Sequence, residues 1–159
     1  MSVLRAITPA DHTRVLAWNA QHVELLSPLD AHRLAELLAW ADLGSVISPA
    51  GRDTGFVLTF AGGTAYDSAN YRWFAQRYRS FYYLDRVVVD PSARRTGVGT
   101  RVYDEIEQRA VELAPVMCLE VNLDPPNEPS LEFHRQRGYV EVGRDDTTGH
   151  LVGLMVKEL

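Results

Sequence analysis

This sequence has almost no cysteine and no long apolar segment. Its 159 residues contain one cysteine, Cys118, which cannot form a disulfide within the chain and is expected to pack in the core. A single thiol is typical of a reducing compartment. No segment reaches the roughly eighteen apolar residues of a membrane helix, and the N-terminus lacks the regions of a signal peptide. We therefore expect a soluble, cytoplasmic protein that does not bind a membrane.

Positive charge is also scarce. Lysine and arginine total 16 against 21 aspartates and glutamates, which gives a formal net charge of -5. A protein that binds nucleic acid through its phosphates needs a basic face, so we expect no nucleic-acid partner. Amine-bearing molecules suit this charge better. The five histidines are scattered without the close pairing of zinc sites, and we expect no metal.

The composition is that of one folded core. Hydrophobic residues make up 46% and charged residues 23%, and a chain of this length has little room for a second core. We expect a single domain over residues 1–159. Apolar periodicity, caps and turn residues predict strands over 3–7, 45–47, 55–60, 81–89, 116–121, 139–142 and 151–156. The same signals predict helices over 11–23, 30–44, 99–113 and 127–137.

A glycine-rich loop follows the strand predicted over 81–89 and opens the helix predicted over 99–113. Its sequence is Arg94-Arg95-Thr96-Gly97-Val98-Gly99, followed by Thr100. The first amides of a helix are unpaired and carry its positive dipole, so they bind anions. Glycine lets a phosphate approach the backbone, and the arginines add charge-assisted contacts. The loop predicts a phosphate site, and a solvated surface turn is the simpler alternative.

Two familiar phosphate-binding loops require residues that differ from those of this loop. A P-loop requires lysine and then serine or threonine after its last glycine, whereas Thr100-Arg101 follows Gly99. A dinucleotide fingerprint requires a third glycine where Val102 stands, and a first glycine almost directly after the strand. The dinucleotide alternative stays open because Glu120 lies about where an acid for the ribose is expected.

The loop resembles the hallmark of the GNAT superfamily of acyl-CoA-dependent N-acyltransferases, Arg/Gln-x-x-Gly-x-Gly/Ala. The sequence Val89-Asp90-Pro91 precedes it, as is usual in that family. A second family pattern, Asn-x-x-Ala/Ser with an aromatic pair and Gly-Phe/Tyr, is similar to residues 127–134 and to Gly138-Tyr139. The resemblance implies an α/β fold of the α+β type. Its mixed, mostly antiparallel sheet has six to seven strands, four to five flanking helices and a splayed parallel pair at the cofactor.

The resemblance also implies a cofactor and its binding residues. The cofactor is acetyl-CoA or another coenzyme A thioester, with its pyrophosphate on the loop. The strand residues would pair their backbone with the pantetheine arm, and the following helix would flank the coenzyme. The implied cofactor residues are Val87, Val88, Val89, Arg94, Arg95, Thr96, Gly97, Val98, Gly99, Thr100, Asn127, Ser130 and Phe133.

The implied reaction is acetyl transfer to a primary amine of a small molecule or peptide, by direct attack in a ternary complex. An alkylammonium has a pKa near 10, so a base must take its proton. Asp85 and Glu120 are the candidate bases, and a salt bridge to Arg86 is the alternative role for Asp85. The family often has tyrosine after the aromatic residue equivalent to Phe133. Here that residue is His134, which can donate a proton near neutral pH or can be purely structural.

Substrate choice is expected to lie with segments that carry no family motif. An aromatic wall beside an acid suits a cationic amine, and core packing is the alternative for these side chains. The candidate substrate residues are Asn19, Glu24, Tyr66, Tyr71 and Trp73. A non-catalytic acyl-CoA sensor is the competing function, and a homodimer stays open.

Overall fold

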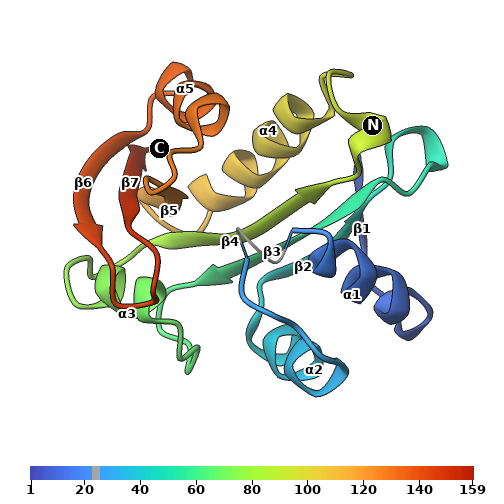
Figure 1. Ribbon diagram of the computed structural model, residues 1–159, viewed down its shortest axis with the longest axis horizontal. Coiled ribbons are helices and arrows are strands. Elements are labelled where there is room, and N and C mark those ends of the chain that lie inside the picture. Colours follow the sequence, from blue (N-terminus) through green and yellow to red (C-terminus); the bar gives the residue numbers. More distant parts are fainter. Residues whose placement is uncertain (23–25) are drawn as a thin grey trace. The chain divides into compact units, whose positions relative to one another are not determined.

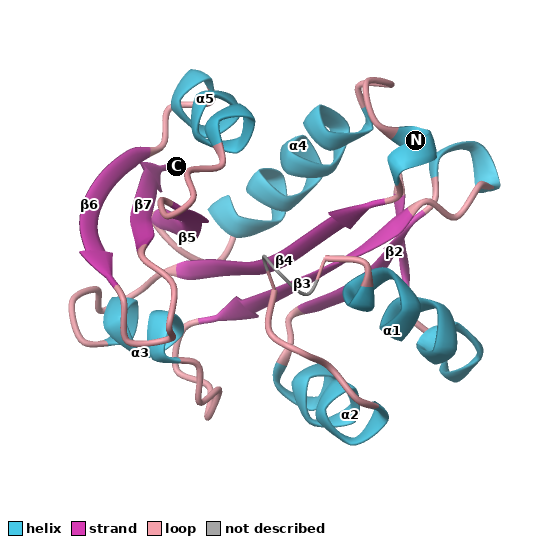
Figure 2. Ribbon diagram, in the orientation of Figure 1, coloured by secondary structure: helices cyan, strands magenta, loops and turns pink. Residues whose placement is uncertain are grey.

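The computed structural model describes residues 1–22 and 26–159 (Figure 1). Within these ranges no helix is long and apolar enough to cross a membrane. Figure 2 distinguishes the helices, strands and loops. The strands are β1 (Leu4–Ala6), β2 (Leu43–Ile47), β3 (Gly55–Ala61), β4 (Tyr82–Val89), β5 (Val116–Asn122), β6 (Val140–Asp145) and β7 (Val152–Glu158). The α-helices are α1 (His12–Ala20), α2 (Ala31–Trp40), α3 (Ala69–Ala75), α4 (Val98–Val111) and α5 (Glu128–Gln136). Short 3-10 turns are η1 (Pro9–Asp11), η2 (Pro49–Gly51) and η3 (Pro91–Ala93).

The strands form one seven-stranded sheet in the order β1-β2-β3-β4-β5-β7-β6. β4 and β5 pair in parallel, with Tyr82 opposite Met117 and Tyr83 opposite Cys118. The pairs β1–β2, β2–β3, β5–β7 and β6–β7 are antiparallel. The mixed, mostly antiparallel sheet with one parallel pair and five helices confirms the predicted fold class.

The described chain divides into two compact units. Unit 1 comprises Met1–Phe60 and Leu84–Arg109, and unit 2 comprises Ala61–Tyr83 and Ala110–Leu159. The single domain expected from composition stays a prediction.

The core of unit 1 follows the predicted apolar periodicity. Trp18 of α1 stacks on Phe56 of β3, with ring centroids 6.5 Å apart. Asp30 caps α2 as predicted, and its carboxylate accepts the amide of Arg33 at 2.7 Å. The predicted end at Gly44 is wrong, because α2 ends at Trp40 and Gly44 lies in β2. Helix α4 buries Val98, Val102 and Ile106, but it ends at Val111 rather than at the predicted residue 113, so Leu113 lies outside it and is exposed.

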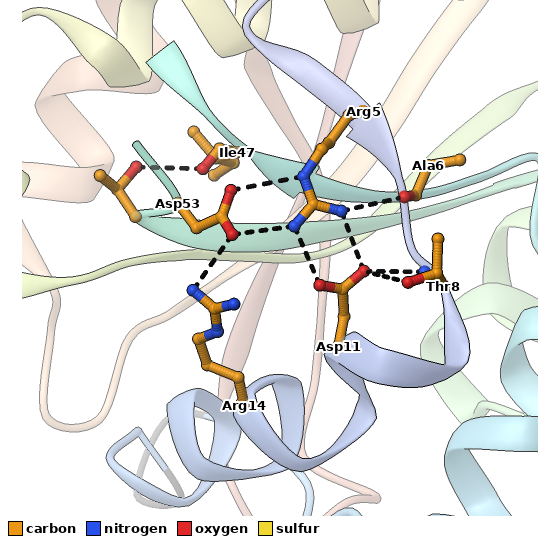
Figure 3. A network of polar contacts seen from close by, with 8 residues as sticks. Arg5, Ala6, Thr8, Asp11, Arg14, Ile47 and Asp53 are labelled. Carbon is orange, nitrogen blue, oxygen red and sulfur yellow. Dashed lines mark hydrogen bonds and ion pairs between the residues drawn. The ribbon is translucent and has the colours of Figure 1, made fainter. Parts of the chain in front are cut away.

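A network of polar contacts in unit 1 joins β1, η1, α1 and the segment before β3 (Figure 3). Arg5 of β1 donates to both carboxylate oxygens of Asp11 at 2.9 Å. The same guanidinium donates to Asp53 at 3.3 and 2.9 Å, and Arg14 reaches Asp53 at 3.1 Å. The amide and hydroxyl of Thr8 donate to Asp11 at 2.8 and 3.0 Å. The guanidinium of Arg5 therefore binds two carboxylates, Asp11 and Asp53, that lie in separate segments of the chain.

Replacing Arg5 with Met is expected to lower the free energy of unfolding near pH 7. The loss should be about 2 kcal/mol, the size of hydrogen bonds to charged groups, because Arg5 is partly exposed while Asp11 is buried. Urea denaturation measures this difference. Arg14→Met is the matched control and should cost less than about 1 kcal/mol, because Arg14 makes one exposed ion pair.

The same substitution has a predictable pH dependence. Hydrogen bonds from Arg5 hold the pKa values of Asp11 and Asp53 below their ordinary range. A carboxyl whose pKa is lower in the folded state stabilises the fold above its unfolded pKa of about 3.9. That stabilisation is lost as the pH falls through the folded pKa. The stability gap between wild type and Arg5→Met should therefore narrow between about pH 5 and about pH 2.5, and a constant gap would contradict the prediction.

Candidate functional site

The predicted coenzyme loop lies in unit 1, between β4 and α4. Asp90 follows the strand, and its carboxylate accepts the amide of Ser92 at 2.9 Å, which lowers the pKa of Asp90. The chain then forms η3 and turns through two residues with positive φ, Arg95 at 62° and Gly97 at 79°. Helix α4 starts directly afterwards at Val98, one residue before the predicted start at Gly99. The turn therefore leads directly into the N-terminus of α4.

The geometry of this turn fits a phosphate. A Cβ built on Gly97 or on Gly99 meets no atom within 4 Å, so the space beside both residues is open. The amides that begin α4 have no acceptor within the helix, by the geometry of any α-helix. Arg94, Arg95, Thr96 and Gly97 are exposed. The predicted pyrophosphate residues thus combine open backbone, unpaired amides and two guanidinium groups.

A histidine that was not predicted contacts the loop. The guanidinium of Arg94 donates to Nε2 of His22 at 2.9 Å, and Nδ1 of His22 lies 3.1 Å from the carbonyl oxygen of Trp18. These two contacts fit the neutral ring with its proton on Nδ1. The two residues are 72 positions apart in the chain, so no local pattern in the sequence could reveal this contact.

The end of β4 presents the three valines predicted to bind pantetheine. Val88 is buried, whereas Val87 and Val89 are half-buried. Strand alternation places Val87 and Val89 on the opposite face from Val88.

Asp85, also on β4, is held by its neighbour in the sequence. Nε of Arg86 donates to its carboxylate at 3.0 Å, and both side chains are buried. Arg86 also donates to Oδ1 of Asn19 at 2.8 Å and to the carbonyl oxygen of Ser27 at 2.9 Å. Asn19 in turn donates to the same carbonyl at 3.0 Å. Asp85 and Asn19 therefore belong to one buried network in unit 1, which matches the alternative considered for Asp85.

Glu120, the other candidate base, lies on β5 in unit 2. The hydroxyl of Tyr83 donates to both of its carboxylate oxygens, at 2.8 and 2.6 Å. Glu120 is half-buried, while Tyr83 is fully buried. The Glu120 carboxylate is therefore hydrogen-bonded to a neutral phenol, and the Asp85 carboxylate to a guanidinium.

Two of the predicted substrate residues lie beside Tyr83. The Tyr71 ring lies 5.5 Å from it and the Tyr66 ring 6.4 Å, measured between centroids. Both rings are buried, and the hydroxyl of Tyr71 donates to the carbonyl oxygen of Ala61 at 2.7 Å. The structure therefore places Tyr66 and Tyr71 in a buried aromatic cluster with Tyr83, which matches the core-packing alternative for these two residues.

Trp73 of α3 lies elsewhere in unit 2. It is half-buried, and the guanidinium of Arg77 lies 3.8 Å from its ring centroid. Its ring packs so closely on Gly143 of β6 that a Cβ there would be 2.5 Å from the ring. Trp73 thus packs on the β6–β7 hairpin. Glu24 lies outside the described residues.

Helix α5 carries the second predicted motif. Asn127 caps it, accepting the amide of Ser130 at 3.3 Å. Phe133 is half-buried, whereas His134 is buried and its ring meets Phe133 and Tyr139 edge-on at 5.4 Å. Nδ1 of His134 lies 2.6 Å from the carbonyl oxygen of Ser130. This nitrogen is therefore engaged within the helix, which matches the structural alternative for His134.

The thiol of Cys118 is buried in β5, as expected. Burial raises its pKa to about 12, which removes the thiolate that a reactive cysteine needs. In the described ranges no group of three or more histidine, cysteine, aspartate or glutamate side chains could hold a metal ion.

Several solved structures are similar to this chain over almost its whole length. Ard1 from Thermoplasma volcanium is 19% identical with a TM-score of 0.76, over 98% of this chain and 96% of that one. Arabidopsis thaliana NAA60 in complex with acetyl-CoA is 16% identical with a TM-score of 0.72, over 98% of each chain. Ribosomal-protein-alanine N-acetyltransferase from Brucella melitensis is 20% identical with a TM-score of 0.69, over 98% of this chain and 99% of that one. At these identities the likeness establishes the fold.

The sequence itself was compared with family models and with curated proteins. No curated protein matched. The model of the acetyltransferase (GNAT) family matches residues 15–139, which include the coenzyme loop, Glu120 and all of α5 with its cap. Because the match covers well over half of the chain, the protein belongs to the acetyltransferase (GNAT) family, and its cofactor is acetyl-CoA.

Proposed function

We propose that the protein transfers an acetyl group from acetyl-CoA to a primary amine of a small molecule or peptide, by direct attack in a ternary complex. The open turn at Gly97 and Gly99 is the observation that supports the proposed binding position of the cofactor. Arg94 and Arg95 add two positive charges beside the first amides of α4. In this proposal the turn binds the pyrophosphate, and Val87 to Val89 bind the pantetheine arm through their backbone.

The residue proposed as the base is Glu120. Oδ2 of Asp85 accepts a hydrogen bond from a buried guanidinium, so this carboxylate is paired with a permanent cation. Glu120 is half-buried, and a neutral phenol hydroxyl donates to its carboxylate. Glu120 takes a proton from the acceptor ammonium, which leaves the amine lone pair free to react. The cofactor, when bound, supplies the activated acetyl thioester, and the overall products are the amide, the free thiol and one proton.

The acceptor class is supported by charge. The half-buried carboxylate of Glu120 favours a cationic amine over an anionic substrate. The Brucella melitensis neighbour is named a ribosomal-protein-alanine N-acetyltransferase, which supports a peptide amine as one acceptor to test. A cytoplasmic location is part of the proposal, and the unpaired thiol of Cys118 supports it.

The direct experiment measures release of free thiol. The protein is incubated with acetyl-CoA and a panel of peptide N-termini and small amines, and a thiol reagent follows coenzyme A. We expect release that depends on both protein and amine. Binding of acetyl-CoA without release across the panel would replace this proposal with the acyl-CoA sensor.

Glu120→Gln tests the base. The amide keeps the shape and an acceptor for the phenol but cannot take a proton, so kcat should fall by about 100-fold or more. Affinity for coenzyme A, measured by calorimetry, should stay within about twofold. Glu158→Gln removes a charge from an exposed position at the end of β7 and serves as the control. Full activity of Glu120→Gln would exclude Glu120 as the base.

A further inference from the structure

The side chains of Tyr83 and Glu120, both in unit 2, form a hydrogen-bonded pair. The phenol hydroxyl approaches both carboxylate oxygens, at 2.8 and 2.6 Å, so it lies between them rather than on one. Tyr83 has no exposed surface, and water cannot replace it. A carboxylate held in this way has a defined orientation, although the residue holding it is 37 positions away in the sequence.

The strand register explains the contact. Tyr83 of β4 is directly opposite Cys118 of β5 in the parallel pair. Glu120 is two residues further along β5, so its side chain is on the same face as that of Cys118. A tyrosine is long enough to reach this diagonal neighbour across the strand pair. The pairing of the two strands therefore sets the distance between the phenol and the carboxylate.

The ring of Tyr83 is itself fixed by aromatic neighbours. Tyr71 meets it edge-on at 5.5 Å with an interplanar angle of 77°, and Phe74 lies 5.9 Å away at 49°. Tyr71 is anchored by its hydroxyl, which donates to Ala61 and accepts from the amide of Thr64 at 3.1 Å. A chain of contacts thus runs from the β3–α3 connection to the Glu120 carboxylate.

We propose that Tyr83 is the positioning residue of the acetyl-transfer site, a proposal that rests on the function proposed above. It holds Glu120 in one orientation by donating a hydrogen bond to its carboxylate. In the proton-transfer step an acceptor N–H bond breaks and an O–H bond forms on one oxygen of Glu120. The Tyr83 O–H bond stays intact, and its hydrogen bond stays on the other oxygen. Tyr83 therefore neither gains nor loses a proton.

A double-mutant cycle tests this role. Tyr83→Phe removes only the hydroxyl and should lower kcat about tenfold, with KM for the amine and affinity for coenzyme A within about twofold. In the Glu120→Gln background the same substitution should have no further effect on kcat, because no base remains to be positioned. The unfolding free energies of all four proteins, without cofactor, should also be non-additive. Tyr82→Phe, on the opposite face of the same strand and also buried, is the control and should leave kcat unchanged.

The outcomes separate the two proposals. If Glu120→Gln is inactive and Tyr83→Phe keeps the wild-type kcat, only the positioning role is overturned. If Tyr83→Phe lowers kcat equally in both backgrounds, the hydroxyl acts through general stability and the positioning role is again overturned. If Glu120→Gln is fully active, the base assignment fails, and the positioning role fails with it.

Discussion

Gly99→Glu is expected to abolish binding of coenzyme A while leaving the fold intact. The new side chain would place a carboxylate in the open space beside the first turn of α4, where the pyrophosphate is proposed to bind. Repulsion between these anions and loss of the space should weaken binding by at least about 100-fold, or about 3 kcal/mol. Isothermal titration calorimetry with coenzyme A measures the change without relying on turnover.

The fold should tolerate this substitution for two reasons. A Cβ at Gly99 meets no atom within 4 Å, and acidic side chains are favourable in the first turn of a helix. The thermal midpoint should therefore not decrease. Gln108→Glu adds the same charge at an exposed position further along α4 and should bind coenzyme A normally. Unchanged affinity in Gly99→Glu would overturn the assignment of the loop.

The elements of the fold were largely predictable because their signals are local. Asp30 and Asn127 cap their helices as expected, and Gly138 has the positive φ, 95°, expected where a helix closes. The parallel pairing of β4 and β5 follows from a strand, helix, strand order. Helix α4 instead ended at Val111, before Leu113, because the apolar period continued two residues beyond the last helical residue.

The candidate site was predictable only in part. The coenzyme loop is contiguous, so residue type and spacing were enough to propose it. Asp85 and Glu120 looked equivalent in the sequence, since each is an acid within an apolar strand. They differ through partners, Arg86 for the first and Tyr83 for the second, and the Tyr83 contact depends on strand register. The roles of both acids in catalysis stay predictions.

Gly55→Ala is expected to cause the largest loss of stability among single-methyl additions in unit 1. A Cβ at Gly55 would lie 1.8 Å from the carbonyl oxygen of Val88 and 3.1 Å from Cα of Val89. These are backbone atoms of β4, which cannot rotate away as a side chain can, so the strands must shift. We expect a loss of about 3 kcal/mol or more in the free energy of unfolding, measured by urea denaturation.

Gly44→Ala provides the matched control, because Gly44 is also a strand glycine of unit 1. Its added Cβ would lie 2.5 Å from Cδ2 of Leu38, the end of a flexible and half-buried side chain. A rotamer change relieves this contact, so the cost should stay below about 1.5 kcal/mol. The shift forced by Gly55→Ala acts on Val88 and Val89, so its affinity for coenzyme A should also fall, whereas Gly44→Ala should bind normally. Equal stabilities of the two variants would show that β4 moves freely beside Gly55, contrary to a rigid strand at the proposed pantetheine site.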